Sequence, residues 1–280
     1  MSQSPGVTRR SLIAGGASTA GLLWAGSALA QGGTDLRGFD PLWRNAEEAI
    51  WTFFGDVAYL SEGLELDLPQ HADVGGSVPL TLRIDAAMTE ADYPRVVHVF
   101  AHGNPTPHVM SAWFTPDSGK AEFSTRIRLE RSQKVTAVAQ MSDGRHIRVD
   151  HEISVSFGAC AQIGSGSNDD VAAFMPESRV AVPATAKRGA IIPIRAVISH
   201  PMETGMRLDG LEEWVRQRII SRFDCVYNGV TVFRTRLHPA IATNPYFLFY
   251  ARAKETDTFE FSWFDTTNFT YTNGAPITII

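Results

Sequence analysis

Residues 123–129 read FSTRIRL, with Phe123, Ile127 and Leu129 on one side of an extended chain and polar residues on the other. Side chains that alternate in this way are typical of a β-strand with one face in a core and one in water. The pattern recurs in the first half of the chain at residues 80–84, 96–100, 135–140 and 153–157. Because Gly, Pro and Asp separate these runs, the first half is predicted to form an antiparallel β-sandwich.

The second half of the chain repeats this alternation. It returns at residues 180–182, 191–198, 223–233, 246–253 and 259–263. Inside the run 223–233 stands Asn228-Gly229, a pair that favours a two-residue hairpin turn between antiparallel strands. The fold class is therefore predicted to be all-β, with two antiparallel sandwiches of similar size.

Two short helices are expected beside the strands. Asp40 followed by Pro41 has the residue types of an N-cap and a first helical position. A helix from there would gather on one face Leu42, Ala46, Ile50, Phe53 and Phe54. Residues 211–220, LEEWVRQRII, are expected to add a short helix to the second sandwich.

A cysteine among small residues stands at the boundary between the two halves. Gly158-Ala159-Cys160-Ala161 follows the last run of the first half, and QIGSGSNDD occupies residues 162–170. This segment is too polar and too rich in Gly and Ser for a regular element, so residues 161–178 are predicted to be a flexible linker between domains at 31–160 and 179–280. The thiol of Cys160 is expected to lie exposed, on an arm that packs against nothing.

The N-terminal residues have the pattern of an export signal. Thr8-Arg9-Arg10-Ser11-Leu12-Ile13 is a twin-arginine pattern, and the apolar run 12–29 leads to the small-residue processing site Ala28-Leu29-Ala30. Residues 1–30 are therefore expected to be a Tat signal peptide that directs the protein to the periplasm. No later run is apolar for long enough to span a membrane, so no span is expected once the signal is removed.

Composition and cysteine count narrow the classes of function. The chain is 44% hydrophobic and 20% charged, as in a globular protein, and its net charge of -5 gives no reason to expect a nucleic-acid partner. In an oxidising compartment Cys160 and Cys225 could form a disulfide. The alternation of Cys225 with Phe223 and Tyr227 favours instead a buried, unreactive thiol on a packed face.

Histidines raise the question of a metal-dependent enzyme. His98, His102 and His108 lie close together in the sequence, but their spacing matches no known metal motif, and a structural or surface role is favoured over a metal site. The chain also has no nucleophile elbow and no phosphate-binding glycine loop. Neither catalytic residues nor a cofactor are therefore predicted.

Several longer strings resemble one family. In the first half they are Asn104-Pro105-Thr106-Pro107, Ser124-Thr125-Arg126-Ile127-Arg128, Val135-Thr136-Ala137-Val138 and Gly158-Ala159-Cys160-Ala161. In the second half they are SHPMETG at 199–205, LHPAIATNPY at 237–246 and FEFSW at 259–263. The first half resembles SoxY and the second SoxZ, the two subunits of the periplasmic carrier of bacterial thiosulfate oxidation, here joined in one chain. The joined form also resembles SoxYZ-like carriers associated with quinoprotein dehydrogenases.

The resemblance implies a fold, a site and partners. Both sandwiches would be immunoglobulin-like and would contact each other, and the chain would be a carrier that is not itself an enzyme. Cys160 would hold a sulfur intermediate, or another thiol-reactive cargo, as a covalent adduct, with Gly158, Ala159 and Ala161 as its arm; alanines 159 and 161 replace glycines of the family's GGCGG arm. Its partners would be periplasmic Sox-type enzymes or cytochromes, or a quinoprotein dehydrogenase.

Two points bear on the role of the thiol. Between Arg148 and Arg179 the sequence offers no Lys or Arg, so activation of Cys160 is expected to come from a partner's active site. The alternative function is a non-covalent binding or scaffold module for a quinoprotein dehydrogenase or cytochrome, in which the thiol carries nothing. A metal-dependent enzyme that uses the region of His98, His102 and His108 is the third hypothesis.

Overall fold

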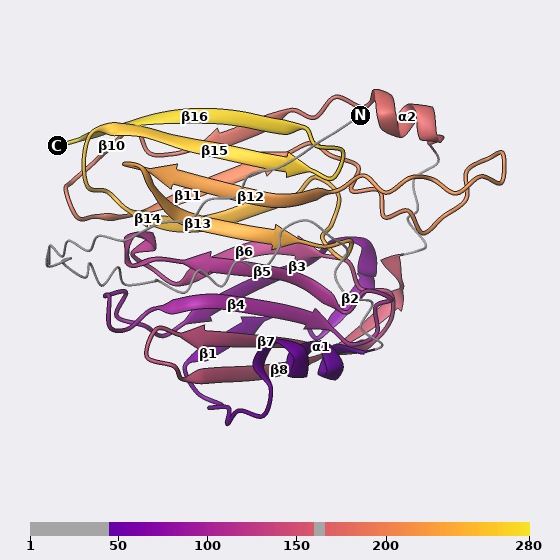
Figure 1. Cartoon of the computed structure of the whole chain (residues 1–280), viewed down its shortest axis with the longest axis horizontal. Helices are drawn as coiled ribbons and strands as arrows, with labels where there is room; N and C mark the ends of the chain where they lie inside the picture. The colour runs from indigo at the N-terminus through magenta and orange to yellow at the C-terminus, as the bar shows by residue number, and fades with distance from the viewer. Residues whose placement is uncertain (1–44, 160–165) are drawn as a thin grey trace, which may run out of the picture. The chain divides into compact units, whose positions relative to one another are not determined.

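Two β-sheets face each other in the structure, a computed structural model that describes residues 45–159 and 166–280 (Figure 1). Within those residues the smaller sheet has six strands, in the order β1 (Leu64–Asp67), β3 (Val78–Ile84), β6 (Glu122–Ile127), β14 (Tyr246–Arg252), β11 (Ile191–Ile198) and β9 (Ser178–Ala181). The larger has ten, in the order β10 (Thr185–Ala186), β16 (Thr270–Ile279), β15 (Asp257–Asp265), β12 (Ile220–Tyr227), β13 (Val230–Leu237), β5 (His108–Phe114), β4 (Pro94–Ala101), β7 (Gln133–Met141), β8 (His146–Phe157) and β2 (His71–Val74). Two 3-10 helices, η1 (Gly75–Ser77) and η2 (Pro116–Ser118), connect strands of the first half.

The prediction of two immunoglobulin-like β-sandwiches is confirmed, and the structure adds how they join. Strands β1 to β8 build the first sandwich and β9 to β16 the second. Strand β13 pairs antiparallel with β5 from Phe233↔Phe114 to Leu237↔Met110, and β14 pairs with β6 at Leu248↔Ser124. Both sheets therefore continue across the boundary between the halves.

The core is also shared by the two halves. Phe123 of the first half lies with its ring centroid 5.8 Å from that of Phe233, and Phe114 lies 5.4 Å from the same ring. Phe233 in turn stacks on Phe249 at 4.5 Å, and all four rings are buried. A fully buried Phe contributes about 2–3 kcal/mol through removal of its surface from water, so this cluster binds the halves strongly.

Cleavage of the chain within residues 160–165 tests the contact between the two halves. A protease site inserted between Gln162 and Ser165 should leave two fragments that remain together, because strand pairing in both sheets and a common core do not depend on the connection. Gel filtration of the cleaved protein should give one peak that contains both fragments. Elution as two separately folded fragments would contradict the shared sheets.

The hairpin and the buried cysteine follow the sequence prediction. Asn228 and Gly229 have φ values of 51° and 71° between β12 and β13, as a type I′ turn requires. Cys225 lies in β12 between β13 and β15, its side chain is fully buried, and its thiol is free. Burial, together with the nearby Asp224, raises the pKa of this thiol well above its ordinary value. The buried position of Cys225 is confirmed and its thiol is free, whereas its low reactivity stays a prediction.

Helix α1 (Ala46–Phe54) covers part of the larger sheet. Its N-cap is Asn45, whose side chain accepts a hydrogen bond of 2.9 Å from the Glu48 N–H, instead of the predicted Asp40. Asp40, Pro41 and Leu42 lie outside the described residues. The buried face of α1 contains Ala46, Ala49 and Ile50 and packs on Phe100 and Val138. Phe54 joins this contact, whereas Phe53 is 37% exposed.

Two expectations, one about the linker and one about the second half, were wrong. Residues 161–178 contain a helix, α2 (Asn168–Ala173), because Ser167 and Asp170 cap its first turn reciprocally. Residues 211–219 form no helix, and Ile220 is the first residue of β12. Residues 211–219 belong to a loop whose two arms are joined by the isolated bridges Glu203↔Arg218 and Leu208↔Trp214. Glu212 has a φ of 62°, which interrupts a right-handed helix at its second residue. Among the described residues, no helix is long and apolar enough to cross a membrane.

Candidate functional site

A cavity of about 530 Å³ opens where the two halves meet, beside the end of β8. Its walls come from four loops that follow strands. They are Asn104-Pro105-Thr106 after β4, Arg128 after β6, residues 201–204 after β11, and Pro239, Ala240 and Thr243 after β13. Ala159 and Gly166, which stand on either side of the undescribed residues 160–165, also line it.

The Asn104 side chain fixes the first of these loops. Its Nδ2 donates to the Arg128 carbonyl at 2.8 Å, and its Oδ1 accepts from the Glu130 N–H at 3.0 Å and from Gln133 Nε2 at 3.0 Å. One amide therefore holds the Asn-Pro-Thr-Pro turn against the strand ends on which the cavity rests.

Arg128 joins the two halves across the cavity wall. Its Nη1 donates to the Met202 carbonyl at 2.8 Å and its Nη2 to the Pro201 carbonyl at 3.3 Å. Its backbone N–H donates to the Ala240 carbonyl at 2.7 Å. Burial lowers the pKa of this guanidinium, and the carboxylates of Glu203 and Glu130 oppose that effect.

The first two residues of the predicted arm pack tightly, so the expectation that the arm packs against nothing is wrong for them. The Ala159 N–H donates to the Leu129 carbonyl at 3.0 Å, and Ala159 is buried. A Cβ on Gly158 would lie 2.0 Å from the Glu130 carbonyl oxygen. Cys160 and Ala161 lie outside the described residues. Glycine is thus required at 158 for the close approach of two backbones.

Replacing Gly158 by Ala should destabilise the protein. The new methyl group would force either the β8 end or the Glu130 backbone to move, at about 1–3 kcal/mol for overpacking of this kind. Urea denaturation monitored by tryptophan fluorescence would measure the change. Gly210→Ala is the control, since a Cβ at Gly210 meets nothing within 4 Å and its φ is not positive, and it should leave stability unchanged. A Gly158→Ala protein as stable as the parent would show that the close contact is absent.

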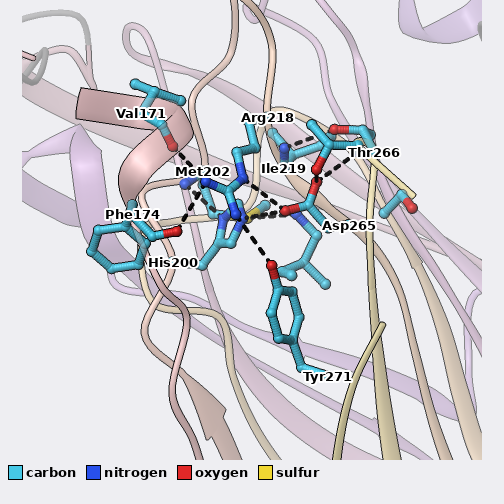
Figure 2. Close-up of polar contacts among 12 residues, drawn as sticks. Val171, Phe174, His200, Met202, Arg218, Ile219, Asp265, Thr266 and Tyr271 are labelled. Atoms are coloured by element: carbon cyan, nitrogen blue, oxygen red, sulfur yellow. Dashed lines mark hydrogen bonds and ion pairs between the residues drawn. The ribbon is translucent and has the colours of Figure 1, made fainter. Parts of the chain in front are cut away.

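On the other side of the cavity, α2 is clamped to the second half by Arg218 (Figure 2). This buried guanidinium donates through Nη1 to the carbonyls of Val171 and Ala172, in the last turn of the helix, and of its C-cap Phe174, the last at 3.0 Å. Its Nε donates to Asp265 Oδ2 at 2.9 Å. Nη2 donates to the Tyr271 hydroxyl at 3.1 Å. Arg218 thereby caps the carbonyl end of α2 with a charge that is itself paired.

His200 completes this network at the start of the His-Pro-Met-Glu-Thr-Gly string. Its Nδ1 accepts from the Met202 N–H at 3.0 Å, which places the ring proton on Nε2, 3.3 Å from Asp265 Oδ2. Burial alone would raise the pKa of Asp265, but hydrogen bonds from His200, Thr267 and Arg218 outweigh it and hold that pKa well below its ordinary value. The Asp265 carboxylate is therefore a fixed negative charge that orients the His200 ring and the Arg218 guanidinium.

Of the three histidines considered for a metal, His98 and His108 lie together, with His98 Nδ1 3.4 Å from His108 Nε2, and His102 does not join them. His98 and His108 are buried with their rings joined through Ser111, whose Oγ lies 2.9 Å from His98 Nδ1 and 3.1 Å from His108 Nε2. His102 instead bonds Thr136 Oγ1 at 2.8 Å. In the part of the chain that the structure describes, no three His, Cys, Asp or Glu side chains are grouped as metal ligands. His238, which comes from the second half, packs on His108 with ring centroids 4.3 Å apart.

Two protein families match the chain one after the other. The family described as "Sulfur oxidation protein SoxY" matches residues 50–160, and the family described as "Sulphur oxidation protein SoxZ" matches residues 180–276. The chain is a fusion of a SoxY domain and a SoxZ domain. The resemblance drawn from the sequence strings is confirmed, and the protein is a SoxYZ-like sulfur-oxidation protein. Hereafter the two parts are called the SoxY half and the SoxZ half.

Solved structures and curated proteins complete the comparison. The sulfur carrier protein SoxY from Chlorobium limicola f thiosulfatophilum is 25% identical, over 39% of this chain and 94% of its own, with a TM-score of 0.34. A β-glycosidase from Bacteroides vulgatus is 9% identical over 78% of this chain and 25% of its own, with a TM-score of 0.23. None of the curated proteins matches the chain.

Local sequence reasoning missed the charged residues of the cavity. Between Arg148 and Arg179 there is no positive charge, yet Arg128 and Arg207 reach the cavity from distant parts of the chain. Arg207 Nε donates to Glu203 Oε2 at 2.8 Å, and its Nη2 donates to the Gly166 carbonyl at 2.8 Å. The available signal was that Arg128 ends the string Ser-Thr-Arg-Ile-Arg and that Arg207 follows the string His-Pro-Met-Glu-Thr-Gly by two positions, because both strings line the cavity.

Proposed function

We propose that the protein is a periplasmic carrier that holds a sulfur intermediate, or another thiol-reactive group, covalently on Cys160 and presents it to partner enzymes. The observation that carries the proposal is the convergence of the SoxY and SoxZ strings on one cavity, at the point where the chain leaves β8. Cys160 follows Ala159 directly in the sequence, and Ala159 is a wall of that cavity. The twin-arginine pattern supports export to the periplasm.

The two anchors of the cysteine segment also support a carrier. Ala159 is held by Leu129 of the SoxY half, and the carbonyl of Gly166 is held by Arg207 of the SoxZ half. Six residues, 160–165, separate these two anchors. A partner enzyme must therefore come to the cavity, because a chain of this length fixed at both ends has a reach of only about 10 Å. Ala161 is the small residue after the thiol that would allow that approach, whereas Gly158 and Ala159 fix the start of the segment against the SoxY half.

The polar groups around the cavity are suited to binding rather than to chemistry. The guanidiniums of Arg128 and Arg207 are engaged by backbone carbonyls and by Glu203, so neither is poised to transfer a proton. In this proposal the carrier provides the thiol of Cys160 as the attachment point and a fixed surface around it, and the partner enzyme activates the thiol. Sox-type enzymes, cytochromes or a quinoprotein dehydrogenase fit that description.

Intact-mass spectrometry of protein isolated from the periplasm tests the function. The wild-type chain should carry an added mass that maps to Cys160 and is lost on reduction, and Cys160→Ser should lack it. A strain with Cys160→Ser should then fail wherever the carried group is needed for growth. No added mass, together with normal growth of Cys160→Ser, would replace the carrier by the non-covalent scaffold for a dehydrogenase or cytochrome.

The two thiols should differ in reactivity. Native, reduced protein should take up one carbamidomethyl group from iodoacetamide, on Cys160, because Cys225 is fully buried between β13 and β15. A second group should be added only in denaturant. Peptide mapping by mass spectrometry would locate each group, and modification of Cys225 in the native protein would contradict its burial.

A further inference from the structure

A loop beside the cavity carries several large apolar side chains that are exposed to solvent. Residues 204–217, here called the 204–217 loop, extend past the strand ends next to α2 (Figure 1). Leu211 is 80% exposed and Trp214 is 66% exposed, and Met206 and Leu208 of the same loop are also exposed. Large apolar side chains that are exposed together on one short loop are typical of interaction sites in soluble proteins, and Trp and Met are enriched at such sites.

The 204–217 loop is nevertheless firmly held. Its two arms bridge at Leu208 and Trp214, and the Asp209 N–H donates to the Glu213 carbonyl at 2.8 Å. Asn168, the first residue of α2, donates through Nδ2 to the Trp214 carbonyl at 3.3 Å and accepts from the Arg216 N–H at 2.8 Å. A surface already ordered before binding loses less entropy when a partner arrives.

The charges of this surface specify the partner further. Glu212 and Glu213 are exposed at the tip of the loop, and Asp169 is exposed on α2. The arginines at its base are neutralised within the protein, Arg207 by Glu203 and Arg218 by Asp265. Apart from Arg216, the exposed charged groups of the loop and α2 are therefore acidic. A partner that fits would offer an apolar pocket with Lys or Arg at its rim.

We propose that the 204–217 loop, with the start of α2 at Asn168 and Asp169, is the docking surface for the partner protein that reacts with the thiol of Cys160. This inference rests on the proposed carrier function. The base of the loop supplies Thr204, Met206 and Arg207 to the wall of the cavity from which the chain leaves at Ala159 and to which it returns at Gly166. Since the cysteine segment is short and held at both ends, a partner that reaches the thiol would contact this neighbouring surface as well.

The test is the loading of Cys160 by a periplasmic extract of the producing organism with added thiosulfate and oxidised cytochrome c. The cytochrome is the electron acceptor, because joining the thiol to the outer sulfur of thiosulfate as Cys–S–S–SO3⁻ releases one proton and two electrons. Reduced full-length protein is incubated in the extract, and intact-mass spectrometry follows the fraction that carries an adduct. Leu211→Ala with Trp214→Ala should slow loading about 30-fold, as expected for loss of a central contact. Trp51→Ala is the matched control, because Trp51 is 67% exposed on α1, and it should load at the parent rate. All variants should melt within about 2 °C of the parent, since the substitutions are exposed.

Further variants separate the possible failures. Glu212→Gln with Glu213→Gln should also slow loading and weaken its dependence on salt. If the adduct forms on the Leu211 and Trp214 variant as fast as on the parent, the docking surface is wrong and the carrier function stands. If the parent itself acquires no adduct, the carrier function and the docking surface that rests on it are both overturned.

Discussion

Replacing Asp265 by Asn is expected to lower the free energy of unfolding by about 3–5 kcal/mol, the usual cost of removing one partner from a buried ion pair. The Asp265 side chain is fully buried and accepts from Arg218, His200 and Thr267, the last through both its N–H and its hydroxyl. Without the carboxylate, the Arg218 guanidinium would remain charged and almost fully buried with no counter-ion. Urea denaturation at pH 7 measures the loss.

The consequences of that change should be local as well as global. Because Arg218 holds the carbonyl end of α2, limited proteolysis of Asp265→Asn should cut near Phe174 and Met175 before it cuts elsewhere. Asp143→Asn is the control, since Asp143 and Arg145 form an exposed pair, and it should change stability by less than about 0.5 kcal/mol. A loss below about 1 kcal/mol for Asp265→Asn would mean that the network contributes little.

Acidification is expected to have an effect of similar size, through the buried histidines. Burial lowers the pKa of His98 to about 3, with a smaller contribution from His238, and lowers the pKa of His108 well below its ordinary value. Both rings pack under Phe53 and Phe100, and Arg236 adds positive charge near His108. These rings stay neutral in the folded protein, whereas an exposed histidine binds a proton near pH 6.5.

The sign of the pH dependence follows from that difference. Since the folded pKa values are depressed, the unfolded chain takes up protons first, and stability present above pH 6.5 is lost as the pH falls towards 3. At pH 4.5, His98 alone should have lowered the free energy of unfolding by about 3 kcal/mol relative to pH 7. Urea denaturation at the two pH values gives the difference.

Two histidine variants check the assignment. His98→Gln should reduce the difference in stability between pH 7 and pH 4.5, because the buried titrating ring is gone. His71→Gln, at a half-exposed side chain on β2, should leave the difference as it is in the parent. Equal pH dependence for the parent and for His98→Gln would exclude His98 as the cause.

Strands and buried faces were predictable from the sequence because their signals are local. Alternation gave the faces of β6 and β11, and Asn228-Gly229 marked a hairpin whose backbone requires positive φ. Helix α2 carried the local signal of its capping pair, Ser167 and Asp170, but its Gly- and Ser-rich surroundings favoured a linker. The loop at 211–220 had the composition of a helix, and the bonds of Arg218 to α2 and Asp265 hold it in another conformation.

The joint between the halves and the cavity could not be read from local patterns. Pairing of β5 with β13 brings together residues more than 110 positions apart, and either strand alone has the alternation of any strand. Arg128 binds carbonyls more than 70 positions away, so nothing near it in the sequence indicates its partners. The family strings pointed to the right loops without showing that they surround one space.

The continuous sheets also bear on how the protein is made. The ribosome completes the SoxY half first, and until β13 and β14 emerge, β5 and β6 are edge strands with unpaired backbone groups. Such edges recruit strands from other chains, and long-range pairing of this kind forms slowly. Synthesis in one polypeptide keeps the matching strands at high local concentration and in equal number, so the nascent first half is completed by its own second half before it can aggregate.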